Sequence, residues 1–210
     1  MENKKTITII NVIMFVFAVV LIGFIITMLI LGDPTNRMLS CVLTLLLYLV
    51  PVLLQWIFKI KIPVALLVIY VSFVTLGAFC GSCLNLTKTL NGFDKVQHTI
   101  WGYISCFIGV FYLCRTGEID TLKKGTIIFV FLGVALATAG LWEVFEFAGD
   151  KLLGQTAQGL PVNGIVAVDD AMYDIICHTA GSLVFTLHYC LDRFLHKNLG
   201  ITSVINNFKK

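Results

Sequence analysis

Apolar stretches about as long as a bilayer-spanning helix follow one another along the whole chain. A helix needs about 20 apolar residues to cross the hydrocarbon core of a membrane. We therefore predict six transmembrane helices, at about residues 7–31, 38–58, 63–86, 94–114, 126–147 and 170–191. The first stretch is longer than the apolar region of a secretory signal and no small-residue cleavage site follows it, so we expect it to stay in the protein.

Composition supports the same class of protein. Apolar residues make up 58% of the chain, charged residues only 13%, and the mean hydropathy is +0.93, whereas a soluble domain has about a quarter charged residues. We expect an all-α polytopic membrane protein forming a single domain over residues 1–210. The net charge is +3, but the chain has no basic patch away from the apolar stretches. This excludes a nucleic-acid-binding role.

The basic residues predict an orientation, because cytoplasmic loops are enriched in Lys and Arg. If the first residues are cytoplasmic, eleven basic residues fall inside and four outside. The inside set is Lys4, Lys5, Lys59, Lys61, Arg115, Lys123, Lys124, Arg193, Lys197, Lys209 and Lys210, and the outside set is Arg37, Lys88, Lys95 and Lys151. We predict that both termini are cytoplasmic.

Acidic residues and two histidines gather at the opposite, outer ends of the last three predicted spans. On a helix, residues three or four apart share a face, and the polar residues keep that spacing. The three stripes are Asp94 and His98; Glu143, Glu146 and Asp150; and Asp170, Asp174 and His178. This divides the chain into scaffold helices (1–92), site helices (93–192) and a cytoplasmic tail (193–210).

A carboxylate at membrane depth is costly unless it is paired, protonated or bound to metal, so these residues are candidates for function. They could ligate one or two divalent cations of the zinc, manganese or magnesium kind, or carry protons or ions along a path. Some could simply cap helix starts, which suits Asp169 and Asp150. That reading fits poorly for the residues inside the spans. The predicted metal ligands are Asp94, His98, Glu143, Glu146, Asp170, Asp174 and His178.

Three motifs on successive spans resemble a known family. They are Asp94-Lys95-Val96-Gln97-His98, Glu143-Val144-Phe145-Glu146 and Asp170-Ala171-Met172-Tyr173-Asp174, with His178 and Gly181 following. Together they resemble the YjdF-like uncharacterised membrane proteins and the related VanZ-like family, over about residues 93–183. The resemblance implies a bacterial cytoplasmic-membrane protein, and VanZ relatives are linked to glycopeptide resistance. VanZ-like proteins often have Asn at the position of His178 and Gln at that of Glu146, and both departures make this site more ligand-like.

Three functions remain open. In the first, an outward-facing site uses a divalent cation to hydrolyse or transfer a group on an envelope lipid or its head group, with Glu146 and His98 as the catalytic candidates and Glu146 as general base. In the second, the same residues bind and release cations or protons in a transporter, although the sequence shows no polar trail to the cytoplasm. A non-catalytic envelope-resistance factor is a third possibility. The oligomeric state is not predicted.

Two further segments bear on these hypotheses. The connection at residues 150–169 is apolar and punctuated by glycines, which suggests a segment on the membrane surface or a lid over the acidic residues. Cys80 and Cys83 form a C-x-x-C pair. We interpret it as small residues that ease helix packing, because no thioredoxin-like context surrounds it.

Overall fold

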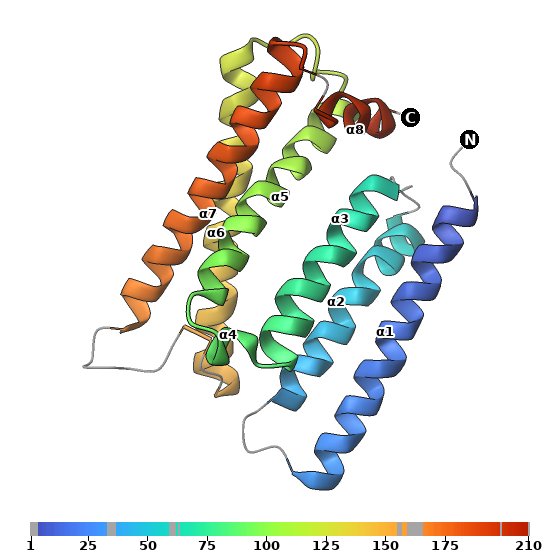
Figure 1. Ribbon diagram of the computed structural model, residues 1–210, viewed down its shortest axis with the longest axis vertical. Helices are drawn as coiled ribbons and strands as arrows, with labels where there is room; N and C mark the ends of the chain where they lie inside the picture. Colours follow the sequence, from blue (N-terminus) through green and yellow to red (C-terminus); the bar gives the residue numbers. More distant parts are fainter. Residues whose placement is uncertain are drawn as a thin grey trace. The chain divides into compact units, whose positions relative to one another are not determined.

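The computed structural model describes residues 4–32, 37–58, 62, 64–154, 157–158, 166–197 and 199–209. All regular structure in these ranges is helical, which confirms the all-α prediction (Figure 1). The elements are α1 (Lys4–Leu31), α2 (Arg37–Phe58), α3 (Val64–Val74), the π-helix η1 (Thr75–Cys83), α4 (Leu86–Thr89), α5 (Phe93–Arg115), α6 (Lys124–Leu153), α7 (Val166–Tyr189), the π-helix η2 (Cys190–Phe194) and α8 (Ile201–Phe208).

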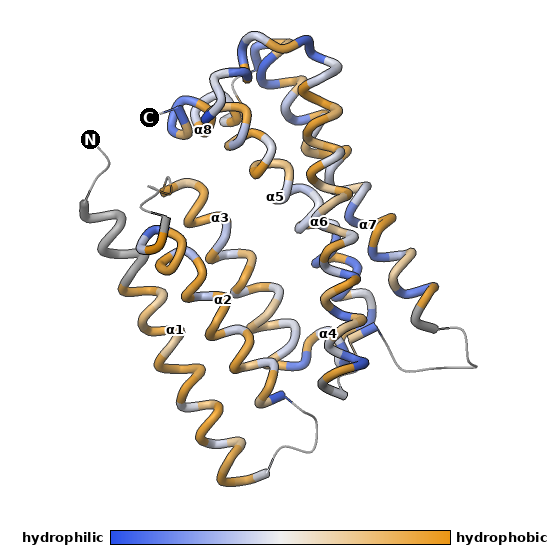
Figure 2. Tube along the Cα trace, turned by 180° about the vertical axis from the view of Figure 1, so that it is seen from behind, coloured by the Kyte–Doolittle hydropathy of each residue, from blue (hydrophilic) through white to orange (hydrophobic). Residues whose placement is uncertain are grey.

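Four stretches of the described helices are long and apolar enough to cross a membrane: Val12–Leu31, Arg37–Ile57, Val64–Cys83 and Lys124–Leu152. Large apolar side chains on them stay exposed, such as Trp56 (77%) and Phe129 (76%). Figure 2 shows apolar residues along the lengths of these helices. Exposed apolar surface of this extent is expected where lipid, not water, is the neighbour. The protein is therefore a membrane protein with several apolar helices, and the count of six spans stays a prediction.

The chain divides into two compact units, Met1–Phe93 and Asp94–Lys210. In the first unit, α1, α2, α3 and η1 enclose a core that contains Leu21, Cys41 and Val74. The hydroxyl of Tyr48 on α2 lies 2.7 Å from that of Thr75, the first residue of η1. Such hydrogen bonds between helices supply polar contacts that lipid cannot.

In the second unit, α5 and α7 approach so closely that only glycine fits at two points. A Cβ atom on Gly102 would lie 1.8 Å from the carbonyl oxygen of His178, and a Cβ atom on Gly181 would lie 1.8 Å from that of Thr99. Small residues at such crossings let helix backbones touch within a membrane. Aromatic rings fill the core below, where Phe185 packs edge-to-face on Phe107 with centroids 4.9 Å apart.

The sequence predicted a cytoplasmic tail at residues 193–210, and the structure shows that this segment contains the docked helix α8. Its Ile201, Ile205 and Phe208 are buried, a spacing of four and three that places them on one face. The carboxylate of Asp192 accepts hydrogen bonds from the backbone N–H groups of Ile201 (3.1 Å) and Thr202 (2.9 Å), and from the Thr202 hydroxyl. Asp192 thereby satisfies backbone donors that a helix leaves free at its start.

The fifth span was predicted to end at about residue 147, and the helix that contains it, α6, continues to Leu153. The helix ends at Gly154, which has a φ of +66°, a left-handed conformation that glycine adopts without strain. Asp150 therefore lies inside α6, where it accepts hydrogen bonds from the backbone N–H groups of Ala157 (2.7 Å) and Gln158 (3.1 Å). Part of the predicted lid, at residues 155–156 and 159–165, lies outside the described part of the chain.

Candidate cation site

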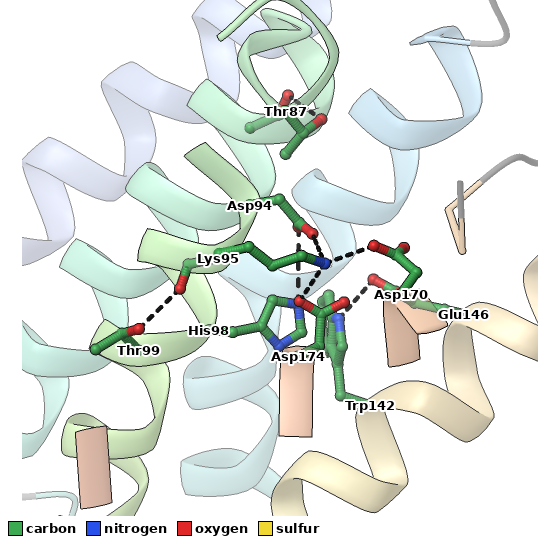
Figure 3. A network of polar contacts seen from close by, with 10 residues as sticks. Thr87, Asp94, Lys95, His98, Thr99, Trp142, Glu146, Asp170 and Asp174 are labelled. Atoms are coloured by element: carbon green, nitrogen blue, oxygen red, sulfur yellow. Dashed lines mark hydrogen bonds and ion pairs between the residues drawn. The ribbon is translucent and has the colours of Figure 1, made fainter. Parts of the chain in front are cut away.

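The first turn of α5 and the first three turns of α7 bring three aspartates around one lysine (Figure 3). The Lys95 ammonium nitrogen Nζ lies 3.1 Å from Oδ2 of Asp94, 2.5 Å from Oδ1 of Asp170 and 2.7 Å from Oδ1 of Asp174. Asp174 is only 1% exposed. Three carboxylates facing one ammonium leave an excess of negative charge at the cluster.

His98, one helical turn after Asp94, extends the cluster inward. Its Nε2 atom lies 3.7 Å from Oδ1 of Asp94 and 3.6 Å from Oδ1 of Asp174, and the residue is 6% exposed. One ligand atom from each of Asp94, His98 and Asp174 falls within 4.8 Å of the others. Two carboxylates and an imidazole at that spacing can converge on one divalent cation.

His178 lies one turn below Asp174 on α7, fully buried at 0% exposure. Its Nε2 atom is 3.2 Å from the hydroxyl oxygen of Ser105 on α5 and 3.4 Å from that of Thr138 on α6. The other ring nitrogen, Nδ1, is buried and has no hydrogen-bond partner among the described residues. A buried polar atom without a partner is costly, so the position of Nδ1 suggests a ligand.

The two glutamates of α6 behave differently from each other. Glu146 accepts a hydrogen bond from the indole N–H of Trp142 at 2.7 Å, and Figure 3 shows this pair beside Asp174 and Asp170. Glu143 is 9% exposed, and its Oε2 atom is the second buried side-chain atom that lacks a partner within the described ranges. The Glu143 side chain also forms a hydrogen bond with Gln158, and it interacts electrostatically with Asp170, Lys95 and Asp94 of the cluster.

The structure thus gathers the sequence-predicted residues of α5, α6 and α7 in the second unit. The closest group contains Asp94, His98, Asp170 and Asp174, whereas His178 faces Ser105 and Thr138. Whether any of them ligates a metal stays a prediction.

Sequence reasoning missed Lys95, Ser105, Thr138 and Trp142. Lys95 adjoins Asp94, and neighbouring residues on a helix do not face each other, so its charge was counted with the loops. The signal that could have found it was a lysine placed at the start of a helix beside two acidic stripes.

Together, the apolar helices and the buried acidic and histidine side chains define a helical membrane protein with a polar cluster inside one helix bundle. The model of the family described as predicted membrane protein (DUF2238) matches residues 12–195, and the chain belongs to this family. This agrees with the resemblance to YjdF-like proteins, whereas the comparisons give no support for a relation to the VanZ-like family. No curated protein and no solved structure matches the chain.

Proposed function

We propose that the protein crosses a bacterial cytoplasmic membrane six times, with both termini in the cytoplasm. In addition to the four apolar helices, α5 has 23 residues and α7 has 24. At about 1.5 Å per residue each reaches roughly 35 Å, enough to cross the hydrocarbon core. Their charges lie mainly near their ends, and the asymmetry of Lys and Arg supports the orientation.

We propose further that the second unit binds a divalent cation through Asp94, His98 and Asp174, with Glu143, Glu146, Asp170 and His178 around it. The observation that carries this proposal is a pair of buried atoms, Glu143 Oε2 and His178 Nδ1, which have no hydrogen-bond partner among the described residues and lie on the helices that carry the carboxylate cluster. Mixed imidazole and carboxylate ligands suit zinc or manganese better than magnesium, which prefers oxygen and water.

A cation in this position supports chemistry on an envelope lipid or its head group. The site lies near the ends of α5 and α7 that the proposed orientation places outside, at the level of head groups. The cation would polarise a phosphoryl or carbonyl oxygen. Glu146, which accepts a hydrogen bond from the Trp142 indole, would take a proton from an attacking water. His98 would bind the cation or move a proton at its Nε2 atom.

The experiment is a metal analysis of the purified protein in detergent, with Asp174→Asn as the test variant and Asp169→Asn as its control. Asp169 is exposed and lies in the first turn of the same helix. We expect about one divalent ion per chain in the wild type and in the control, loss of the ion in Asp174→Asn, and a lower melting temperature after EDTA. Wild-type protein that carries no stoichiometric ion and melts unchanged in EDTA would contradict the proposal.

A transporter that moves cations or protons is the second candidate, and one observation favours it. Polar side chains continue below His178: the Tyr103 hydroxyl lies 2.5 Å from Nδ1 of His188, whose Nε2 lies 3.1 Å from the carbonyl oxygen of Leu199. The sequence had suggested no polar groups along this depth.

Proteoliposomes loaded with a pH-sensitive dye test this candidate. Cation-dependent proton movement that Glu143→Gln and Tyr103→Phe both abolish would favour transport over the enzyme. If vesicles with the wild-type protein take up protons no faster than protein-free vesicles, the transporter candidate is wrong.

A further inference from the structure

The lysine at the centre of the acidic cluster has a geometry that suggests a role in choosing the ion. We infer that Lys95 is a tethered competitor of the bound cation: its ammonium group neutralises the carboxylates until a divalent cation displaces it. Monovalent cations cannot displace it, so Lys95 makes the site selective for charge. This inference rests on the cation site proposed above and assigns one of its residues a regulatory part.

Each N–H donor of the Lys95 ammonium group has a carboxylate acceptor in the structure. An ammonium has three N–H donors and no acceptor, and Nζ of Lys95 contacts three carboxylate oxygens, one from each of Asp94, Asp170 and Asp174. The closest two contacts, at 2.5 and 2.7 Å, reach across from α5 to α7. Figure 3 shows the side chain extended between the acidic residues, with its nitrogen toward them.

The lysine and the proposed cation would use the same two carboxylates, and at Asp174 the same oxygen atom. Asp94 and Asp174 belong both to the three-residue ligand group and to the partners of Lys95. Oδ1 of Asp174 lies 2.7 Å from Nζ of Lys95 and 3.6 Å from Nε2 of His98. A zinc or manganese ion bonded to that oxygen would stand about 2.0–2.2 Å from it. Two positive centres on one buried oxygen repel each other strongly, so the ammonium must leave when the ion enters.

The competition depends on ionic charge. A sodium or potassium ion brings the same charge as the ammonium, and the ammonium is held nearby by its own chain at a high effective concentration. Replacing the ammonium with a monovalent ion therefore gains no binding free energy. A divalent ion doubles the attraction to the carboxylates and can displace the lysine. The Lys95 side chain is 30% exposed, and its flexible four-carbon stem lets the displaced ammonium reach water.

Binding of cations to purified protein in detergent, followed by calorimetry with manganese, zinc and sodium chlorides, tests this role. Lys95→Met removes the charge at nearly constant length, and Lys95→Arg keeps a cation there. Lys151→Met is the matched control, because Lys151 is also on the second unit and its Nζ lies 5.8 Å over the ring of Phe147. We expect Lys95→Met to bind manganese or zinc at least tenfold more tightly and to gain sodium binding, with Lys95→Arg and Lys151→Met near the wild type.

A second measurement needs no variant. Acetylation of lysine amines in the wild type, quantified peptide by peptide by mass spectrometry, should be slow at Lys95 in EDTA and several-fold faster with saturating manganese. Lys151 serves as the internal reference and should not change. This measurement decides the matter if Lys95→Met does not fold.

The outcomes separate the two proposals. If the wild type binds a divalent ion, but Lys95→Met binds it no more tightly or Lys95 acetylation does not rise, the competitor role is wrong and the cation site stands. If neither the wild type nor Lys95→Met binds any divalent ion, the cation site itself is wrong. Sodium binding by the wild type at a strength equal to that of Lys95→Met would also overturn the inference.

Discussion

Gly102 on α5 touches the backbone of His178 on α7, and a single added methyl group would lie 1.8 Å from the His178 carbonyl oxygen. This contact holds together the two helices that carry Asp94, Lys95 and His98 on one side and Asp170 and Asp174 on the other. The geometry of the cluster therefore depends on this close contact between the two backbones, which lies further along α5 and α7 than the charged residues.

Gly102→Ala should destabilise the protein and disturb the cluster, because the clash is with backbone and neither helix can yield locally. Overpacking of this kind costs about 1–3 kcal/mol. Thermal unfolding in detergent measures it. Gly140→Ala on α6 is the control, since a Cβ atom there meets nothing within 4 Å; it should melt at or slightly above the wild-type temperature. Equal melting temperatures for both variants would show that α5 and α7 are not in close backbone contact at Gly102.

Glu143→Leu should stabilise the metal-free protein and weaken cation binding at the same time. The change removes a buried carboxylate oxygen that has no hydrogen-bond partner in the described part of the chain, and such an atom costs about 1–3 kcal/mol. Functional sites often carry such a cost. Melting in EDTA should rise for Glu143→Leu, whereas the extra stability from added manganese should shrink. A variant less stable than the wild type in EDTA would mean that the loss of the Glu143–Gln158 hydrogen bond outweighs the gain from removing Oε2.

Asp192→Ala should release α8 from the second unit. The change leaves the N–H groups of Ile201 and Thr202 without their acceptor, at a cost of about 1–2 kcal/mol, as for other helix caps. Alkylation of Cys114 reports the release, because its sulfur lies 4.0 Å from the Ile205 carbonyl oxygen and it is 7% exposed. Cys114 should react faster in Asp192→Ala than in the wild type, and at the wild-type rate in the control Glu118→Gln.

The same carboxylate predicts a pH dependence. Burial alone would raise the pKa of Asp192, but hydrogen bonds from Thr202 and the backbone outweigh it and hold the pKa below its ordinary value of 3.8. A lowered folded-state pKa contributes stability above 3.8 and loses it as the pH falls through the folded value. Amide hydrogen exchange at Ile201 and Thr202 should show equal protection at pH 7 and pH 5 after correction for intrinsic rates. Loss of protection already at pH 5 would contradict the cap.

Asp120→Asn should matter far less, although Asp120 also contacts the C-terminal segment. Its carboxylate binds Lys209 and, at 2.7 Å, Arg193, and the hydrogen bond from Lys209 is the main cause of its lowered pKa. The side chain is 49% exposed, and exposed ion pairs contribute about 0–1 kcal/mol. Cys114 alkylation should rise slightly at low salt and match the wild type in high salt. A release as large as that of Asp192→Ala would show that the ion pairs dominate.

The long helices could be predicted because each apolar run must match the thickness of a bilayer, so length alone locates them. Helix ends were harder to predict: the fifth span was expected to end at about residue 147, but α6 continues until the left-handed Gly154 ends it. The helix α8 was readable, since Ile201, Ile205 and Phe208 have helical spacing, yet the lysines around it suggested only a basic tail.

The candidate site was predicted in its acidic and histidine residues because helical spacing brings them to one face. Only some of its polar residues could be predicted. Lys95, Ser105 and Thr138 enter through contacts between helices, such as the 3.2 Å approach of Ser105 to His178, and no periodicity along one segment reveals which neighbour it meets.

The π-helix η1 has a consequence for variation among members of the family. A π-turn holds one residue more than an α-turn, so a chain one residue shorter between Thr75 and Cys83 could close the turn as ordinary α-helix. The π-turn absorbs its extra residue, so the helix beyond the deletion would keep nearly the same phase relative to α3. Cys83, now 3.4 Å from the Thr44 hydroxyl, would stay on the same face of the helix. Relatives with such a gap are therefore expected to keep both Thr44 and Cys83.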